Sequence, residues 1–169
     1  MGIKAEIQAS IGWNWSDGAV LNDRLAYAAT LLEGADANQA EAAWVDADQS
    51  LTSGTSTTYD LTALTRTLLG DTHTTTLLAV RGLLIINHAT SAGTLVVGGA
   101  TSNPWSAPLG DSADTLHVPP DGVALLVNRA DGWDVDASHC NLKLAASGGD
   151  VDYSIALLGN LTAGSSSSS

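Results

Sequence analysis

Clustered carboxylates are the first feature of this chain that could carry chemistry. Asp131, Asp134 and Asp136 lie within six residues beside Gly132, and calcium is bound by carboxylate oxygens on tight turns. Their spacing departs from the EF-hand loop, and aspartate is also a common turn former. We therefore expect no metal site and no cofactor, and retain Asp131, Asp134 and Asp136 as the candidates for a structural calcium ion.

A nucleophile beside a general base is the second possibility. His139 and Cys140 are adjacent in the sequence, but neighbouring residues of a strand point to opposite faces. No G-x-S-x-G elbow occurs, and the four histidines lack the short spacings of zinc sites. Cys140 reads as a small buried hydrophobic residue. The sequence predicts no catalytic residues, and we expect the protein not to be an enzyme.

Tryptophans and one arginine are the candidates for an interface. Trp13, Trp15, Trp105 and Trp133 each lie near a predicted turn or strand end, where an exposed aromatic ring can anchor a protein contact or stack on a sugar. Packing within the domain is the alternative for each of them. Arg81 is the one charge in a long apolar stretch. If buried it needs a carboxylate partner, and at a subunit contact it would be an anchor.

That apolar stretch, residues 77–99, is the element around which we expect the domain to form. Residues 77–87 and 94–98 are rich in Leu, Ile and Val and are separated by a small polar turn. Such runs fit strands buried on both faces. We predict that they form a hairpin in the middle of a sheet, with residues 123–127 and 151–158 as its partners.

The N-terminal segment alternates cleanly between apolar and polar residues over positions 3–15, which predicts a half-buried strand. Residues 19–33 fit either a strand or a helix, and we favour a strand. The first strand could be an edge strand of the domain, or an arm that packs on a neighbouring subunit. We divide the chain into an N-terminal strand or arm region (1–33), a sandwich domain (34–160) and a flexible Ser-rich tail (161–169).

Short strands with frequent turn signals fill the rest of the chain. We expect strands at 41–52, 59–64, 115–118 and 140–146, turns at 16–18 and 53–58, a loop at 66–76 and an ordered surface loop at 98–110. About nine or ten strands without intervening helices predict an all-β sandwich of jelly-roll or Greek-key topology. The function is expected at the edges: the N-terminal strand and the 98–110 loop.

The charge balance excludes some partners. The 169 residues carry 18 acidic against 6 basic side chains, a net charge of −12. Phosphate binding needs clustered Lys and Arg, so we expect neither nucleic acid nor an anionic membrane to bind. No stretch is apolar for long enough to span a bilayer or to form the h-region of a signal peptide.

Several segments together resemble a family of small structural proteins of tailed bacteriophages. These are GADANQAE at 34–41 before Trp44, YDLTAL at 59–64, VRGLLIIN at 80–87, LVVGGATSN at 95–103 and PPDG at 119–122. The resemblance implies a virion protein made in the host cytoplasm, of the head decoration (cement) type with a jelly-roll fold. It also implies a homo-oligomer, commonly a trimer, that contacts the major capsid protein or another virion protein.

A carbohydrate-binding jelly-roll module is the alternative function, on the virion surface or in a tail adhesin. It would use Trp105, Trp133 and the 131–136 turn, with calcium as a possible cofactor.

Overall fold

One five-stranded and one four-stranded antiparallel sheet form the body of the molecule. The computed structural model describes residues 3–16 and 20–161, which form β-strands and no helix. The β8 sheet has the order β11 (Val123–Val127), β8 (Ala79–Asn87), β14 (Val151–Asn160), β4 (Ala42–Leu51), and the short β12 (Trp133–Asp134) also pairs with β8. The β9 sheet has the order β10 (Thr115–Val118), β9 (Thr94–Gly98), β13 (Asn141–Ser147), β5 (Ser56–Asp60). The predicted all-β sandwich is confirmed.

The strands pair from the ends of the sandwich sequence inward. β4 pairs with β14, β5 with β13, β8 with β11, and β9 with β10, each antiparallel. Among these eight strands, consecutive ones therefore alternate between the two sheets, apart from β9 and β10. This nested pairing brings the two halves of the domain together over one core.

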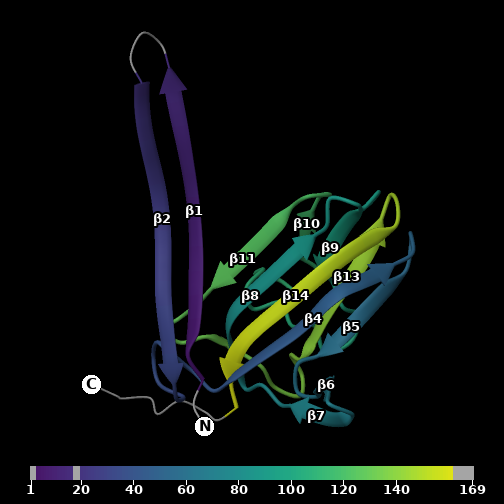
Figure 1. Cartoon of the computed structure of the whole chain (residues 1–169). Coiled ribbons are helices and arrows are strands. Elements are labelled where there is room, and N and C mark those ends of the chain that lie inside the picture. The colour runs from purple at the N-terminus through teal and green to yellow at the C-terminus, as the bar shows by residue number, and fades with distance from the viewer. Residues whose placement is uncertain (1–2, 17–19, 162–169) are drawn as a thin grey trace.

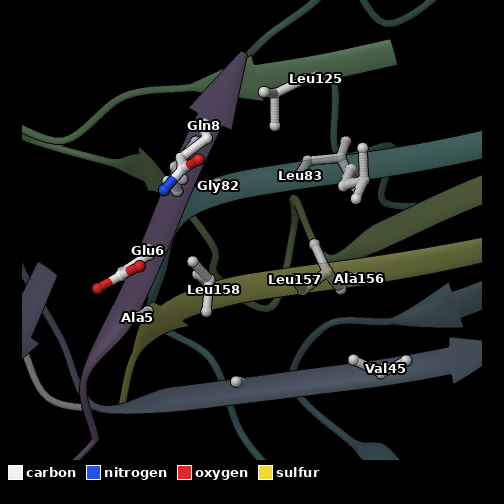
Figure 2. Close-up of a pocket in the computed structure, with 13 residues that line it drawn as sticks. Ala5, Glu6, Gln8, Val45, Gly82, Leu83, Leu125, Ala156, Leu157 and Leu158 are labelled. Carbon is white, nitrogen blue, oxygen red and sulfur yellow. The ribbon is translucent and has the colours of Figure 1, made fainter. Parts of the chain in front are cut away.

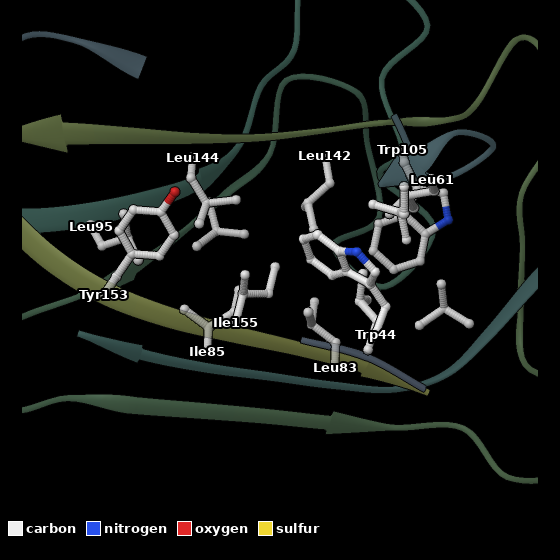
Figure 3. Packing of buried hydrophobic residues seen from close by; sticks show 14 of the residues in the cluster. Trp44, Leu61, Leu83, Ile85, Leu95, Trp105, Leu142, Leu144, Tyr153 and Ile155 are labelled. Carbon is white, nitrogen blue, oxygen red and sulfur yellow. The ribbon is translucent and has the colours of Figure 1, made fainter. Parts of the chain in front are cut away.

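The core lies between the two sheets and follows from the two-residue period of their strands. Leu83 and Ile85 of β8 face Leu142 and Leu144 of β13, and all four are buried. Figure 3 shows these side chains packed with Trp44, Tyr153 and Trp105. The continuous cluster explains how a chain without phenylalanine fills its interior, since Trp and Tyr supply the large rings.

The predicted hairpin of residues 77–99 is wrong, although both of its strands exist. β8 and β9 lie in opposite sheets, so the connection 88–93 crosses the edge of the sandwich. Both edges of β8 are already hydrogen-bonded, by β11 and β14, as the sequence predicted for these partners. β9 consequently has no free edge of β8 to pair with. The side chain of Asn87 holds this connection in place, because its Nδ2 donates to the carbonyl oxygens of Gly93 and Val118.

Two further boundaries differ from the prediction. β5 begins within the predicted turn at Ser56 and ends at Asp60, and residues 61–63 turn instead of continuing the strand. The predicted loop at 66–76 is a hairpin of β6 (Leu64–Leu68) and β7 (Asp71–Thr75). Its two connecting residues, Leu69 and Gly70, both have positive φ, of 54° and 94°, which matches the twist of a two-residue hairpin turn. The hairpin is polar and threonine-rich, so hydrophobic periodicity gave no signal for it.

The N-terminal segment forms a ribbon that rises away from the sandwich (Figure 1). β1 (Ala5–Ser16) pairs with β2 (Val20–Glu33) along their whole length, and the short β3 (Gln39–Ala40) pairs in parallel with the end of β2. Both predicted strands are confirmed, and β1 is not an edge strand of the sandwich. We call β1 and β2 the arm. The middle of the predicted 16–18 turn and the tail from residue 162 onward lie outside the described residues.

Candidate functional site

The arm sorts its side chains onto two different faces. Residues opposite each other in an antiparallel pair share a face, and the register places Ile7 opposite Ala29, Ile11 opposite Leu25, and Ala9 opposite Tyr27. Trp13 and Trp15 follow on the same face of β1. We call this the apolar face of the arm. The other face of β1 carries only Glu6, Gln8, Ser10, Gly12, Asn14 and Ser16.

Only the base of the apolar face is covered. Ile7 and Leu31 are buried, together with Ala40 of β3, against Leu125 and Leu158 of the β8 sheet. Farther along, exposure rises steeply: Ile11 is 72% exposed, Trp15 63% and Leu25 73%. Trp13 and Tyr27 are exposed as well. Twelve strand residues extend roughly 40 Å, so most of this apolar surface has no partner within the chain.

A groove runs beside the base of the arm on the outer face of the β8 sheet (Figure 2). Its volume is about 430 Å³. The lining is almost entirely apolar, with Glu6 as its charged residue and Gln8 beside it. The sheet contributes Ala43, Val45, Gly82, Leu83, Leu84, Leu125, Ala156, Leu157 and Leu158. We call this the arm-base groove.

Arg81 is buried inside the molecule, at 4% exposure, so its predicted role as an interface anchor is wrong. Amide and backbone carbonyl oxygens take the place of the predicted carboxylate partner. The Nε of Arg81 donates to Asn160 Oδ1 at 2.7 Å, and its Nη1 donates to the carbonyl oxygens of Arg129 at 2.8 Å and of Ala130. Its Nη2 donates to the carbonyl oxygens of Ala35 at 3.1 Å and of Asp36 at 3.3 Å.

These contacts hold the loop that follows β2 against the sandwich, and we call this arrangement the Arg81 clamp. Ala35 belongs to the loop that follows β2, and Asn160 reinforces that loop by donating from Nδ2 to the Gly34 carbonyl oxygen at 2.9 Å. Burial lowers the pKa of the Arg81 guanidinium, and the charges of Asp131 and Asp36 act in the opposite direction. The guanidinium can be buried because its donors are satisfied by fixed carbonyl dipoles.

Trp105 belongs to the core and not to an interface. It is 1% exposed, its Nε1 donates to the Asp134 carbonyl oxygen at 2.9 Å, and its ring meets that of Trp133 edge-on at 6.4 Å between centroids. The interface prediction for Trp105 is therefore wrong. Trp133 is half-buried against the same cluster, and its interface role stays a prediction. Trp13 and Trp15 are exposed, as an interface requires.

The acidic turn does not assemble a calcium site. The described part of the chain contains no group of three or more His, Cys, Asp or Glu side chains placed to share a metal ion, so Asp131, Asp134 and Asp136 are not brought together. Asp136 Oδ1 instead accepts from the backbone N–H groups of Ser138 and His139, at 2.7 and 2.9 Å. The His139 ring contact and these N–H bonds lower the pKa of Asp136. This is the turn-forming role of aspartate.

Cys140 and His139 do not form a nucleophile and base. Cys140 is buried, and burial raises the pKa of its thiol, which disfavours the reactive thiolate. The exposed His139 ring contacts Asp136 through Nδ1, at 3.1 Å from each carboxylate oxygen. The pair therefore offers no activated nucleophile.

A hydrogen-bonded group of two tyrosines and an aspartate, which no sequence pattern indicates, lies at one edge of the core. The Tyr59 hydroxyl is 2.9 Å from Asp46 Oδ2 and 2.7 Å from the Tyr153 hydroxyl. Burial, followed by these hydrogen bonds, raises the pKa of Tyr59, and burial is also the main cause of the raised pKa of Tyr153. Neutral phenols in this position hold β4, β5 and β14 together and are not poised to transfer protons.

Comparisons with protein-family models, curated proteins and solved structures found no match to this chain.

Within the described residues, no helix is long and apolar enough to cross a membrane.

The arm-base groove is the functional feature that sequence reasoning missed. A signal for it exists: β8 and β11 are apolar at both odd and even positions. We interpreted this pattern as burial on both faces. The structure covers the inner face with the β9 sheet and the outer face only at the base of the arm.

Proposed function

We propose that this chain is a non-enzymatic structural protein of a tailed-phage virion, which decorates the capsid and stabilises the head through contacts between copies. The observation that carries the proposal is the arm, whose apolar face is covered only near Ile7 and Leu31. Contiguous apolar surface of this extent is characteristic of interaction sites on soluble proteins. A protein that functions by assembly has a use for such a surface.

In this proposal the sandwich is a jelly roll. The nested pairing of β4 with β14, β5 with β13, β8 with β11 and β9 with β10 supports it, because a jelly roll consists of eight strands in two Greek keys. Jelly rolls occur in viral capsid proteins and in lectins. The topology is therefore compatible with decoration and with the carbohydrate-binding alternative, and surface features must distinguish them.

The resemblance to small phage structural proteins and the acidic charge specify the partners that we propose. Copies of the chain associate with one another as a trimer, and the trimer contacts the major capsid protein or another virion protein. A net charge of −12 opposes direct contact with packaged nucleic acid or an anionic membrane. Repetition over a shell makes weak individual contacts sufficient, since each additional contact acts at high effective concentration.

The carbohydrate-binding alternative has less support. It relied on Trp105 and Trp133 as stacking rings, and Trp105 is buried with its Nε1 engaged by a backbone carbonyl. It also relied on a calcium turn, and the Asp136 carboxylate is occupied by backbone N–H groups. The surface near Trp133 thus lacks both the paired rings and the converging carboxylates.

Co-sedimentation with phage heads tests the proposal. Heads that lack the decoration protein are mixed with the full chain, and we expect saturable binding together with slower release of DNA on heating. A chain that stays monomeric and never sediments with heads would contradict the decoration role. A glycan array run with and without a chelator tests the alternative, which predicts binding that is lost with the chelator.

A further inference from the structure

The outer face of the β8 sheet is apolar across all four strands. In the hydrogen-bonded register, Leu125 of β11 is level with Leu84 of β8, Leu84 with Ala156 of β14, and Ala156 with Val45 of β4. These residues face outward because their strand neighbours Leu83, Ile85, Ile155 and Leu157 are the ones that point into the core. A continuous apolar row therefore crosses the sheet from one edge to the other.

The chain's own arm covers this face only in part. Gly82, Leu158 and Ala43 form the row next to the first one, and Ile7 lies over Gly82, where an added Cβ would be 3.3 Å from Ile7 Cδ1. Leu158, and Leu125 at one end of the first row, pack against the cluster of Ile7, Leu31 and Ala40, whereas Ala43 and Val45 on β4 are exposed. The arm-base groove, whose lining includes Ile7, lies on this face beside the base of the arm (Figure 2).

The opposite face of the sandwich is different. On the β9 sheet, the outward positions include Ser56, Thr58, Asn141 and Lys143, which line a smaller polar hollow with Ala100, Thr101 and Ser102. A polar outer face is what an antiparallel sheet normally presents to water. The apolar outer face of the β8 sheet is therefore a specific feature of that sheet and not a property of the whole surface.

We propose that the arm-base groove of each copy receives the apolar face of the arm of a second copy. The inference rests on the proposed function and names the contact that holds the copies together. Ile11, Trp13, Trp15, Leu25 and Tyr27 of the donor arm would lie on the row formed by Val45, Leu84, Leu125 and Ala156 of the acceptor sheet.

Continuity with the existing arm–sheet contact is the first argument. Ile7 and Leu31 already show that this face of the arm packs on this face of the sheet. Ile11 and Trp15 continue the same face of β1, but the arm carries them away from its own sandwich (Figure 1). The chain thus presents two complementary apolar surfaces that cannot reach each other within one molecule.

Charge is the second argument. Two copies that each carry −12 repel each other over most of their surface. The apolar face of the arm carries Asp23, opposite Trp13, and Glu33, the last residue of β2, and the groove carries Glu6; the other described positions of the two surfaces are uncharged. Contact at these surfaces therefore brings the fewest like charges together.

The arm supplies a large part of the area that such a contact needs. A buried aromatic side chain contributes 150–250 Å², so the exposed parts of Trp13, Trp15, Tyr27, Ile11 and Leu25 amount to on the order of 500 Å². Each partner of a standard specific interface buries on the order of 800 Å², so these five side chains account for more than half of the donor's share. The contact joins two different surfaces, so three copies can close it as a ring.

Disulfide trapping between differently tagged copies tests the contact. In a Cys140→Ser background, one copy carries Ile11→Cys on the arm and a co-expressed copy carries Val45→Cys in the groove; both positions are exposed. We expect mild oxidation to give at least fivefold more cross-linked heterodimer than the matched control, Ser10→Cys with Val45→Cys. Ser10 is the neighbour of Ile11 on the opposite face of the arm. Equal yields from the two pairs would overturn the inference.

Native mass spectrometry of the otherwise unmodified chain separates this inference from the proposed function. We expect Ile11→Asp to raise the concentration at which the oligomer dissociates at least tenfold, and Ser10→Asp to leave it within twofold. A wild-type oligomer that both variants leave intact would overturn the arm–groove contact but not the assembly role. A wild-type chain that is monomeric at every concentration would contradict both.

Discussion

Arg81 shows how a single buried charge can set the position of a whole element. Its guanidinium collects carbonyl oxygens from the loop after the arm, from the segment 129–130 and, through Asn160, from the end of β14. Arginine suits this role because its planar fork offers five donors in fixed directions. The arm therefore leaves the sandwich along a defined path and not through a free linker.

Replacement of Arg81 should destabilise the chain strongly. Arg81→Gln leaves several partly buried carbonyl acceptors and the buried Asn160 Oδ1 without a donor, and an unsatisfied buried group costs about 1–3 kcal/mol, so we expect a loss of about 3 kcal/mol in the free energy of unfolding. Urea denaturation measures it, with the exposed Arg66→Gln on β6 as the control. Equal stability of the two variants would contradict the clamp.

Asp152 gives the stability a defined pH dependence. Its carboxylate accepts from Ser50 Oγ at 2.7 Å and from Thr90 Oγ1 at 3.0 Å, and these bonds lower its pKa below the ordinary value of 3.8. A carboxylate with a lowered folded-state pKa stabilises the fold above its unfolded-state pKa, and this contribution is lost as the pH falls through the folded-state value. The urea midpoint of wild type should therefore fall more between pH 6 and pH 2.5 than that of Asp152→Asn. Parallel pH profiles would show that Asp152 contributes nothing.

At the scale of elements, the arm depends on one glycine of the sheet beneath it. Ile7 packs over Gly82, where a Cβ would already lie 3.3 Å from Ile7 Cδ1. Gly82→Val adds a branched side chain there, and overpacking of this kind costs typically 1–3 kcal/mol. We expect faster hydrogen exchange at the amides of Ile7 and Leu31, with unchanged protection in β13.

The control for this experiment is Ala43→Val, on the exposed part of β4. It adds comparable volume to the same sheet face at a position that is open to solvent. If both variants alter hydrogen exchange in the arm equally, or if neither does, the packing of the arm does not depend on Gly82.

Strand positions were predictable from the sequence because they depend on local alternation and local turn residues. Strand partners were harder to predict than strand positions. Residues 88–93 have the composition of a hairpin turn, but β8 cannot pair with β9 because β11 and β14, which are far away in the sequence, occupy both edges of β8. The threonine-rich β6 and β7 escaped detection because, among their described side chains, only Leu64 is buried. Hydrophobic periodicity detects strands that bury one face, and a polar hairpin buries almost no apolar side chains.

The candidate site was predictable only in part, for the same reason. Trp13 and Trp15 are exposed, as their predicted interface role requires, because the arm carries them away from the sandwich; that role stays a prediction. Trp and Arg are residue types that are common at interfaces, but Trp105 and Arg81 are both buried. Trp105 is buried because the segment 102–105 folds back onto β13 through Asn141. Arg81 is buried because its guanidinium donates to acceptors within the molecule. The arm-base groove exists only once four strands are aligned side by side.

At the scale of the whole molecule, acidic repulsion and apolar attraction would oppose each other in the proposed assembly. Salt screens repulsion between the copies, each with a charge of −12, and barely weakens apolar contact. The oligomer should therefore tighten as salt rises from 0.05 to 0.5 M, by several-fold in its dissociation concentration. Light scattering measures this, and weakening with salt would indicate that ion pairs and not the arm hold the copies together.

The central claim is that the chain functions as an assembly held together through its uncovered arm. Sedimentation velocity on the full chain over a hundredfold range of concentration tests it most directly. We predict a species of three times the 17.2 kDa chain mass that persists to low micromolar concentration and gives way to monomer in Ile11→Asp. A wild-type chain that sediments as a 17.2 kDa monomer throughout would contradict the account.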